Sequence, residues 1–300
     1  MTKLISLSDA ISTYVQDGDI IYAAGFTHLI PFAAGHEIIR QGKRDLVLAR
    51  ATPDLIYDQM VAAGCARKVI WSYMGNPGVG SLRLVRGAVE RGEVEWEEYS
   101  HFGMITRLQA GASGLPFLPM NQTGVQDLEN ANPLIKHITD PYGGKDVIVV
   151  PALNPDVAIV HVQRSDCFGN AHIWGNLGII REAAMASRAI VLTVEEIVEP
   201  DLISSDPNRV LIPGFRVNAV VHAPWGAHPS PVPGYYNRDH QAFIEYRRAS
   251  RTPRYFKTWK SRWVDSIDSG ADYVKLLGGE RLEALGITHH ARSETVDYGY

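Results

Sequence analysis

The sequence has few cysteines and no long hydrophobic run. Cys65 and Cys167 are the only cysteines among its 300 residues, which is too few for a disulfide framework, although a single bridge between them remains open. No apolar stretch approaches the roughly 20 residues that a membrane-spanning helix needs, and the N-terminal residues lack the apolar centre of a signal peptide. The sequence therefore predicts a cytoplasmic protein without a membrane partner.

An excess of charge of one sign is also missing. The formal net charge is −4 at pH 7, so the composition gives no reason to expect a nucleic-acid partner. With 45% hydrophobic and 21% charged residues, the chain has the composition of an ordinary globular protein. Its length allows one large domain or two small ones, with a sizeable core.

The common motifs of self-contained catalytic sites are absent as well. There is no G-x-G-x-x-G, P-loop, H-E-x-x-H or G-x-S-x-G pattern, and neither cysteine belongs to a C-x-x-C pair. We interpret His289 and His290, near the C-terminus, as part of a solvated tail. The sequence thus predicts no metal site.

Short β-branched runs that alternate with helical segments are what the sequence does contain. This alternation predicts an α/β fold with an open, largely parallel sheet and helices on both faces. The strand-like runs are 20–24, 46–49, 68–73, 96–99, 146–151, 156–162, 189–194 and 217–222, and the clearest helical segments are 8–15, 53–64, 81–91 and 101–112.

Two regions depart from this alternation. Residues 121–145 are rich in Asn, Asp, Gly and Pro and lack periodicity, which favours a long functional loop or an internal seam. Residues 238–273 are rich in Arg, Lys, Trp and Tyr and are typical of helices. We therefore expect an α/β domain over 1–235 and a C-terminal helical extension over 236–300 that packs on the same domain.

Three glycine-containing turns are candidate sites. Gly25 follows the first strand, where backbone N–H groups can meet an anion or a thioester oxygen, although a plain strand-to-helix turn is the alternative. Asn76, in a second turn with Gly78 and Gly80, can hold an acyl or amide group, or the turn is simply the start of a helix with Ser81 near its cap. The third stretch is 107–117, with Arg107 and Gln109 as candidates.

These turns resemble motifs of the family I CoA-transferases. Ala24-Gly25-Phe26 resembles the Gly-Gly-Phe loop in the α subunit of the glutaconate and 3-oxoadipate type, with Ala24 in place of a glycine. The second turn resembles the Asn-x-Gly turn of that fold, and 107–117 resembles its Arg-x-x-x-Gly-x-x-Gly-Leu-Pro signature. Gly226-Ala227-His228-Pro229-Ser230 is typical of the same branch. The likeness covers roughly residues 1 to 280.

The resemblance implies the CoA-transferase fold and half of an active site. Members of this family use a glutamate nucleophile, which forms a mixed anhydride and then a glutamyl-CoA thioester. In the two-subunit members this glutamate belongs to the β subunit. No such glutamate motif occurs here, and the adjacent Glu195 and Glu196 would face opposite sides of a strand. The chain is thus expected to be an α subunit that pairs with a β subunit, in an assembly of two α and two β subunits or larger.

The resemblance also assigns roles to the candidate residues. The oxyanion-binding wall would be Gly25, Phe26, Thr27 and His28, and acyl or CoA contacts would come from Asn76, Gly78, Gly80, Arg107 and Gln109. Coenzyme A enters as a substrate, and no other cofactor is expected.

The implied substrates are succinyl-CoA and 3-oxoadipate, because 25–31 and 52–59 are closest to that branch. A ring-opening hydrolase of cyclic diketone-CoA esters and a non-catalytic acyl-CoA-binding protein remain open.

Overall fold

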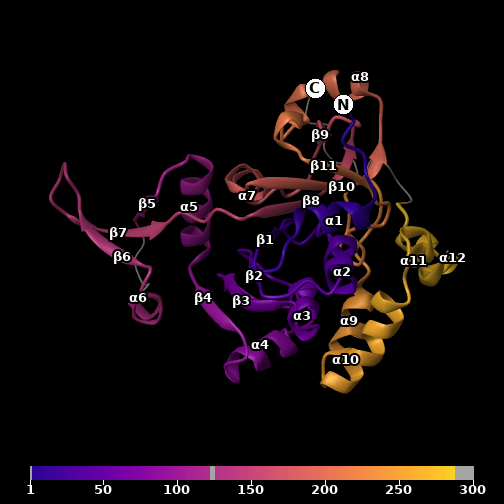
Figure 1. Ribbon diagram of the computed structural model, residues 1–300, viewed down its shortest axis with the longest axis horizontal. Coiled ribbons are helices and arrows are strands. Elements are labelled where there is room, and N and C mark those ends of the chain that lie inside the picture. Colours follow the sequence, from indigo (N-terminus) through magenta and orange to yellow (C-terminus); the bar gives the residue numbers. More distant parts are fainter. Residues whose placement is uncertain (1, 122–125, 288–300) are drawn as a thin grey trace.

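A single large sheet forms the centre of the computed structural model, which describes residues 2–121 and 126–287. Seven of its eight strands run parallel in the order β11-β10-β8-β1-β2-β3-β4, and β9 pairs antiparallel with β8 (Figure 1). The strands are β1 (Ile20–Ala23), β2 (Leu46–Ala49), β3 (Ala66–Trp71), β4 (Glu95–Glu98), β8 (Val157–Ser165), β9 (Ala171–His172), β10 (Ala189–Ile197) and β11 (Ala219–His222).

Helices cover both faces of this sheet, as the alternating pattern predicts. Because neighbouring residues of a strand point to opposite faces, Ile21 and Ala23 enter one core while Tyr22 and Ala24 enter the other. The first core is covered by α1 (Leu7–Tyr14), α2 (Phe32–Arg40), α3 (Leu55–Ala62) and α4 (Arg83–Glu90), and the second by α5 (His101–Ala112) and α7 (Ile180–Ala186).

A small arm projects from the main body (Figure 1). It contains β5 (Phe117–Met120), β6 (Lys136–Thr139) and β7 (Asp146–Pro151), paired antiparallel in the order β5-β7-β6, together with α6 (Gln126–Ala131). The expectation of a long loop over 121–145 was wrong where the structure describes it, and 146–151 is not a strand of the parallel sheet. All four residues of β6 are exposed, so this strand has no apolar alternation to reveal it.

The C-terminal part is helical, as expected. It contains α9 (His240–Ala249), α10 (Pro253–Lys260), a π-helical turn (Ser261–Asp265), α11 (Gly270–Leu277) and α12 (Gly279–Leu285). Phe243, Tyr246, Phe256 and Val264 enter the first core. The division into two regions at residue 235 remains a prediction, and His289 and His290 lie outside the described residues.

Local chemistry sets the shorter features. The N-cap of α1 is Ser6, whose Oγ accepts from Asp9 N–H, so this helix begins slightly before the expected residue. The segment between β10 and β11 contains α8 (Pro200–Ser204) and two 3-10 turns (Pro207–Arg209 and Gly214–Arg216).

Cys65 and Cys167 are both free. Within residues 2–121 and 126–287, no helix is long and apolar enough to cross a membrane.

Candidate active site at the carboxyl end of strand β1

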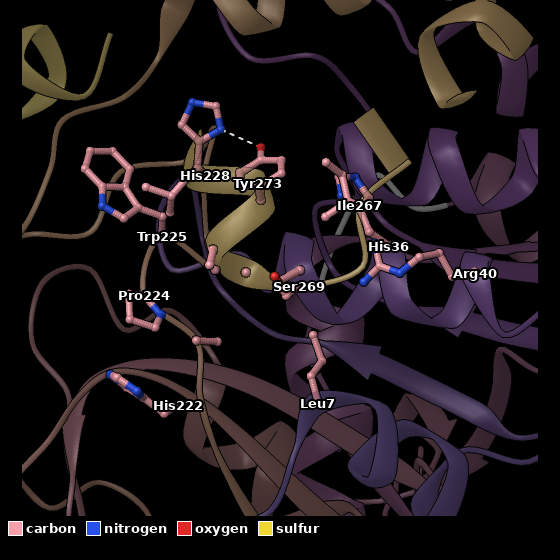
Figure 2. A pocket seen from close by; sticks show the side chains of 16 residues that line it. Leu7, His36, Arg40, His222, Pro224, Trp225, His228, Ile267, Ser269 and Tyr273 are labelled. Carbon is pink, nitrogen blue, oxygen red and sulfur yellow. Dashed lines mark hydrogen bonds between the residues drawn. The ribbon is translucent and has the colours of Figure 1, made fainter. Parts of the chain in front are cut away.

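A cavity of about 470 Å³ lies between α2, the segment that follows β11, and α11, with Leu7, Trp225 and Ser269 around it (Figure 2). Its two buried histidines are already engaged. His36 Nε2–H donates to Gln59 Oε1, and His228 lies between Tyr273 and Asp239. Burial lowers the pKa of His36 to about 4 and lowers the pKa of His228. His228 is thus engaged at both ring nitrogens and His36 at Nε2, and the lowered pKa values favour the neutral form of both imidazoles.

The topology of the sheet points to another place. From β1 the chain adds β2, β3 and β4 on one side, and it later adds β8, β10 and β11 on the other. The carboxyl end of β1 is therefore a topological switch point, where open α/β sheets bind ligands. The segment that leaves β1 there, residues 24–31, is called the glycine loop below.

The glycine loop is tightly folded and strained. Gly25 has φ +100°, and a Cβ on it would lie 2.6 Å from the carbonyl oxygen of His28 and 2.7 Å from that of Leu29. Thr27 and Leu29 also have positive φ, 63° and 55°, which costs a non-glycine residue about 1–3 kcal/mol. Such a conformation persists only if the surrounding structure holds it.

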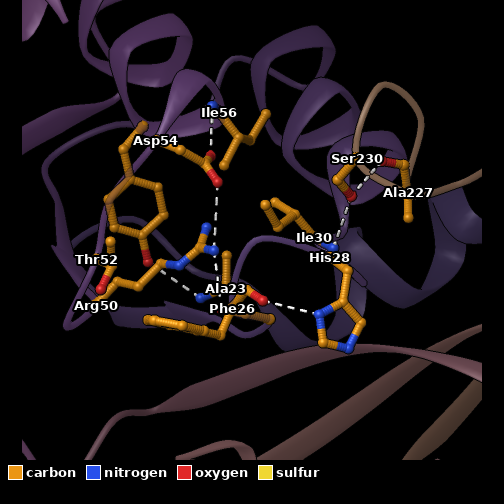
Figure 3. A network of polar contacts seen from close by, with 12 residues as sticks. Ala23, Phe26, His28, Ile30, Arg50, Thr52, Asp54, Ile56, Ala227 and Ser230 are labelled. Carbon is orange, nitrogen blue, oxygen red and sulfur yellow. Dashed lines mark hydrogen bonds and ion pairs between the residues drawn. The ribbon is translucent and has the colours of Figure 1, made fainter. Parts of the chain in front are cut away.

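Arg50 holds the first peptide of the loop (Figure 3). It follows β2 directly, is 1% exposed, and donates from Nη2 to the carbonyl oxygen of Gly25 at 2.9 Å. Asp54 Oδ2 lies 3.3 Å from the same nitrogen. Because a trans peptide is planar with its C=O and N–H opposed, a Gly25 carbonyl directed at Arg50 turns the N–H of Phe26 away from Arg50.

His28 holds the next peptide in the same manner. Its Nδ1–H donates to the carbonyl oxygen of Phe26 at 2.8 Å, which turns the N–H of Thr27 away from His28. Burial lowers the pKa of His28, so the ring is neutral and its Nε2 carries a lone pair. That atom is buried without a partner in the described part of the chain, beside Gly175, where an added Cβ would come within 2.7 Å.

The far end of the loop is tied to residues 226–231, called the strap below. Leu29 N–H donates to the carbonyl oxygen of Pro231 at 3.1 Å, and Ile30 N–H donates to Ser230 Oγ at 3.1 Å. The Ser230 hydroxyl in turn donates to Ala227 O, and Ala33 N–H donates to Gly226 O. The strap thus fixes the exit from the loop and the start of α2.

Adjacent backbone donors of the glycine loop remain free in this arrangement. Among the described residues, the N–H groups of Gly25, Phe26, Thr27 and His28 have no acceptor. Those of Phe26 and Thr27 belong to the two peptides that Arg50 and His28 hold. Phe26 is half-buried and Thr27 is exposed, so the pair lies near the surface of the loop. Preorganised backbone N–H groups of this kind stabilise negative charge that develops on a carbonyl oxygen.

The second glycine turn, residues 74–81, is called the open turn below. It closes on itself through bonds between Asn76 and Gly80, and Asn76 Nδ2 reaches Phe243 O at 3.4 Å. Asn76 Oδ1 is buried and has no partner within the described residues. Gly78 and Gly80 are exposed beside a hollow of about 520 Å³.

The helix after the open turn offers no place for a substrate anion. The N–H groups of Leu84 and Val85, in the first turn of α4, already donate to Asp58 Oδ1 at 3.0 and 2.8 Å. Burial raises the pKa of Asp58 to about 6. Ser81 does not cap this helix, whose N-cap is Leu82 without a side-chain bond.

Comparison with known proteins identifies the family of this chain. A family model described as coenzyme A transferase matches residues 4–223. The chain belongs to the coenzyme A transferase family. It is 45% identical over 284 residues to the A subunit of 3-oxoadipate CoA-transferase from Pseudomonas knackmussii, an alignment that covers 93% of this chain and 100% of that protein.

Two further relatives show the range of the family. The solved structure of glutaconate coenzyme A-transferase from Acidaminococcus fermentans superposes with a TM-score of 0.90 at 34% identity and covers 96% of each chain. The cholesterol ring-cleaving hydrolase IpdA subunit of Mycobacterium tuberculosis is 30% identical, over 83% of this chain and 89% of that one. The family fold expected from the sequence is thus confirmed, and the family includes chains with different activities.

Arg107 and Gln109, of the third candidate stretch, lie on α5. The Arg107 side chain is buried, donates to Pro151 O at 3.0 Å and pairs with Glu97 at 3.1 Å. Its guanidinium also lies 4.4 Å from the centre of the Tyr99 ring. Gln109 is exposed. Arg107 therefore joins α5 to β4 and β7, and none of these contacts connects it to the glycine loop.

Glu195 and Glu196 point to opposite sides of β10, as expected. Glu195 is buried and accepts hydrogen bonds from His161, Tyr236 and the N–H of Trp225, each at 2.7 Å. Glu196 accepts from Tyr235. Because both oxygens of Glu195 are occupied, this carboxylate is not free to attack a substrate.

The sequence reasoning missed Arg50 and the glycines that cover the loop. Gly175 leaves room for His28, and Gly178 leaves room for Phe26. A Cβ added to Gly178 would lie 3.2 Å from the Cβ of Phe26. Arg50 and Asp54, four residues apart directly after a buried strand, were a visible signal for a charge pair at the carboxyl edge of the sheet. No group of three or more His, Cys, Asp or Glu side chains within the described ranges could hold a metal ion.

Proposed function

We propose that this chain is the α subunit of a CoA-transferase that acts on succinyl-CoA and 3-oxoadipate. The observation that carries the proposal is the pair of free N–H groups at Phe26 and Thr27, on a strained loop tied by Arg50 and the strap. The 45% identity to one subunit of a 3-oxoadipate CoA-transferase supports the choice of substrates.

The attacking group in this proposal belongs to a β subunit. The carboxylate of a glutamate in that partner adds to the thioester carbonyl of succinyl-CoA, and the Phe26 and Thr27 N–H groups receive the oxyanion. Expulsion of CoA thiolate gives a mixed anhydride. The thiolate then attacks the glutamyl carbonyl, which releases succinate and leaves a glutamyl-CoA thioester. Reversal of these steps with 3-oxoadipate gives 3-oxoadipyl-CoA and restores the glutamate.

The neutral state of His28 suits this reaction. Carboxylates and thiolate exchange places on acyl carbons, so no step in the sequence requires a net proton transfer. Stabilisation of the oxyanion is the main demand on the α subunit, and one such donor is commonly worth about 3 kcal/mol. His28 contributes by fixing the Phe26 carbonyl.

We also propose that the open turn contributes to acyl or CoA binding through Asn76, Gly78 and Gly80. The free Oδ1 of Asn76 supports a contact with a donor such as an amide N–H of the pantetheine arm. For Arg107 and Gln109 the same role remains a proposal that rests on the family motif, since the contacts of Arg107 are internal. The two free cysteines support a cytoplasmic location.

The test is to co-express the chain with its β partner and to incubate the purified complex with succinyl-CoA and 3-oxoadipate. We expect 3-oxoadipyl-CoA and succinate in equal amounts, and a CoA adduct on the β chain when the acceptor acid is left out. The chain without its β partner is the control and should be inactive. A complex that moves CoA between no pair of dicarboxylates would refute the proposal.

A ring-cleaving hydrolase is the second candidate, favoured by the unpartnered Nε2 of His28. A hydrolase needs a base for water, and a neutral buried imidazole with a free lone pair can serve as one. With a cyclic diketone-CoA ester, this activity would give a ring-opened CoA ester and no new thioester. The substitution His28→Gln should abolish this hydrolysis and reduce CoA transfer only moderately.

A further inference from the structure

A buried arginine such as Arg50 is an unusual donor to a loop carbonyl. Its guanidinium is 1% exposed, and its Nε and Nη1 have no acceptor within the described residues. A buried donor without a partner costs about 1–3 kcal/mol. Arginine is almost never fully buried unless it is paired, and Arg50 is paired with Asp54 through Nη2 alone. A neutral donor could bind the same carbonyl at a lower cost.

The protein contains a more ordinary tie of the same type. Arg44 donates from Nη1 to the carbonyl oxygens of Ala63 and Gly64, at 3.1 and 2.9 Å, near the surface and at the end of α3. Both arginines bind backbone carbonyls, but only Arg50 does so in the interior and at the carboxyl end of β1. Arg44 therefore shows what such hydrogen bonds contribute to stability. Any further effect of Arg50 must come from its charge and its place beside the glycine loop.

The charge of Arg50 acts on the peptide that follows Gly25. A cation that donates to a peptide oxygen polarises the amide, and in a low-dielectric interior this strengthens the opposite N–H as a donor. The group so strengthened is Phe26 N–H, one of the free donors of the loop. The same contact prevents the peptide from flipping, which would place a carbonyl oxygen where the N–H now lies.

We propose that Arg50 is a positioning residue, which orients and polarises the Gly25–Phe26 peptide so that Phe26 N–H receives the developing oxyanion. This inference rests on the proposed function. Asp54, 3.3 Å from Nη2, keeps the guanidinium in place. Arg50 does not touch the substrate in this role and acts through the loop.

The experiment compares three variants in the αβ complex. Arg50→Met retains the length of the side chain and removes its charge and donors, Arg50→Lys retains the charge and one donor, and Arg44→Met is the matched control. We expect Arg50→Met to lower kcat for CoA transfer by about 10²–10³-fold, the range for loss of one oxyanion donor, with KM for succinyl-CoA changed less than about threefold. Arg50→Lys should recover about tenfold of the loss.

A second readout is independent of activity. Amide hydrogen exchange of peptides that span residues 24–31 should accelerate in Arg50→Met, because the hydrogen-bonded N–H groups of Leu29 and Ile30 lose protection when the loop loosens. It should stay unchanged in Arg44→Met, which should lower only the melting temperature. Wild-type kcat in a folded Arg50→Met complex, or a rise in KM at constant kcat, would overturn the inference. If Arg50→Met does not fold, the same kcat-against-KM comparison in Arg50→Lys decides.

The two proposals fail in different ways. A wild-type complex that transfers no CoA refutes the proposed function alone, because the exchange measurement still shows whether Arg50 holds the loop. A wild-type complex that transfers CoA, with Arg50 variants that leave both kcat and loop exchange unchanged, refutes the positioning role alone.

Discussion

The glycine loop and the open turn occupy equivalent places in the fold but are built differently. Each follows a parallel strand and leads into a helix at the carboxyl edge of the sheet. A Cβ at Gly25 would collide with two carbonyl oxygens, whereas no atom of the described residues lies within 4 Å of one at Gly78. The loop is held by Arg50 and the strap, while the open turn closes mainly on itself. Position at the sheet edge thus does not by itself create a preorganised donor site.

Gly25→Ala should show the largest effect. The substitution places a methyl group 2.6 Å from His28 O in a backbone with φ +100°, so the loop must change its course and lose both donors. We expect kcat/KM of the αβ complex to fall by roughly 10³-fold or more. Steady-state kinetics on a complex of verified composition would measure this. A fall of less than tenfold would show that the loop is not the oxyanion wall.

Ser230→Ala tests the strap. It removes the acceptor for Ile30 N–H, which leaves one buried donor unpaired at a cost of about 1–3 kcal/mol. It also removes the hydroxyl that donates to Ala227 O, which keeps its bond from the Ser230 N–H. We expect urea unfolding to show this loss and kcat to fall about tenfold. Ser204→Ala is the control, because its exposed hydroxyl donates only to Asp201 O. Equal effects of the two substitutions would contradict a special role for the strap.

Asn76→Ala tests whether the open turn binds substrate. If the buried Oδ1 accepts from the CoA moiety, its loss should raise KM for succinyl-CoA about fivefold, which corresponds to about 1 kcal/mol. We expect kcat to change little, because this contact is equal in ground and transition states. An unchanged KM in Asn76→Ala would make the turn purely structural.

Acidification should weaken the glycine loop more than the open turn. Burial lowers the pKa of His28 below its ordinary 6.5, so below about pH 6.5 the unfolded chain binds a proton before the folded one does. The stability that comes from keeping His28 neutral is complete above pH 6.5. It is lost as the pH falls toward the lowered pKa of His28 in the folded protein. Urea unfolding at pH 7 and pH 5 should show a smaller loss for His28→Gln than for the wild type. Equal losses would contradict the burial of a neutral His28.

Gly78→Ala should have the smallest effect. Its φ of +72° is unfavourable for alanine, at a cost of about 1–2 kcal/mol, but the methyl group comes within 4 Å of no atom in the part of the chain that the structure describes. We expect a small decrease in melting temperature and an unchanged kcat. A loss of activity comparable to that of Gly25→Ala would erase the distinction between the loop and the turn.

The sequence predicted the parallel sheet well because burial on two faces leaves a strong signal. Runs such as 46–49 and 189–194 are continuous and almost entirely apolar, and both became strands of the main sheet. In the arm, 146–151 was expected as a strand and forms β7, whereas β6 escaped detection because it is exposed along its whole length. A strand without a buried face has no periodicity to read.

Part of the candidate site was also predictable from the sequence. Gly25 was recognisable by its place after a strand, and the family motif named Phe26, Thr27 and His28. The tie between Arg50 and the Gly25 carbonyl depends on how β1 and β2 align, which composition does not reveal. Ser230 was noted as part of a motif, but its bond to Ile30 depends on a tertiary contact between distant segments.

The strap also affects how the protein is made. Ile30 and the serine that accepts its N–H are 200 residues apart in the chain, and β1 acquires its second neighbour only when β8 has been added. During synthesis from the N-terminus, the glycine loop emerges early but lacks its anchors until residues 226–231 have followed. Contacts that close such long stretches of chain form late and slowly. A ribosome-bound or prematurely terminated chain would therefore carry the loop without its shape, and the Phe26 and Thr27 N–H groups would reach their final positions only as folding is completed.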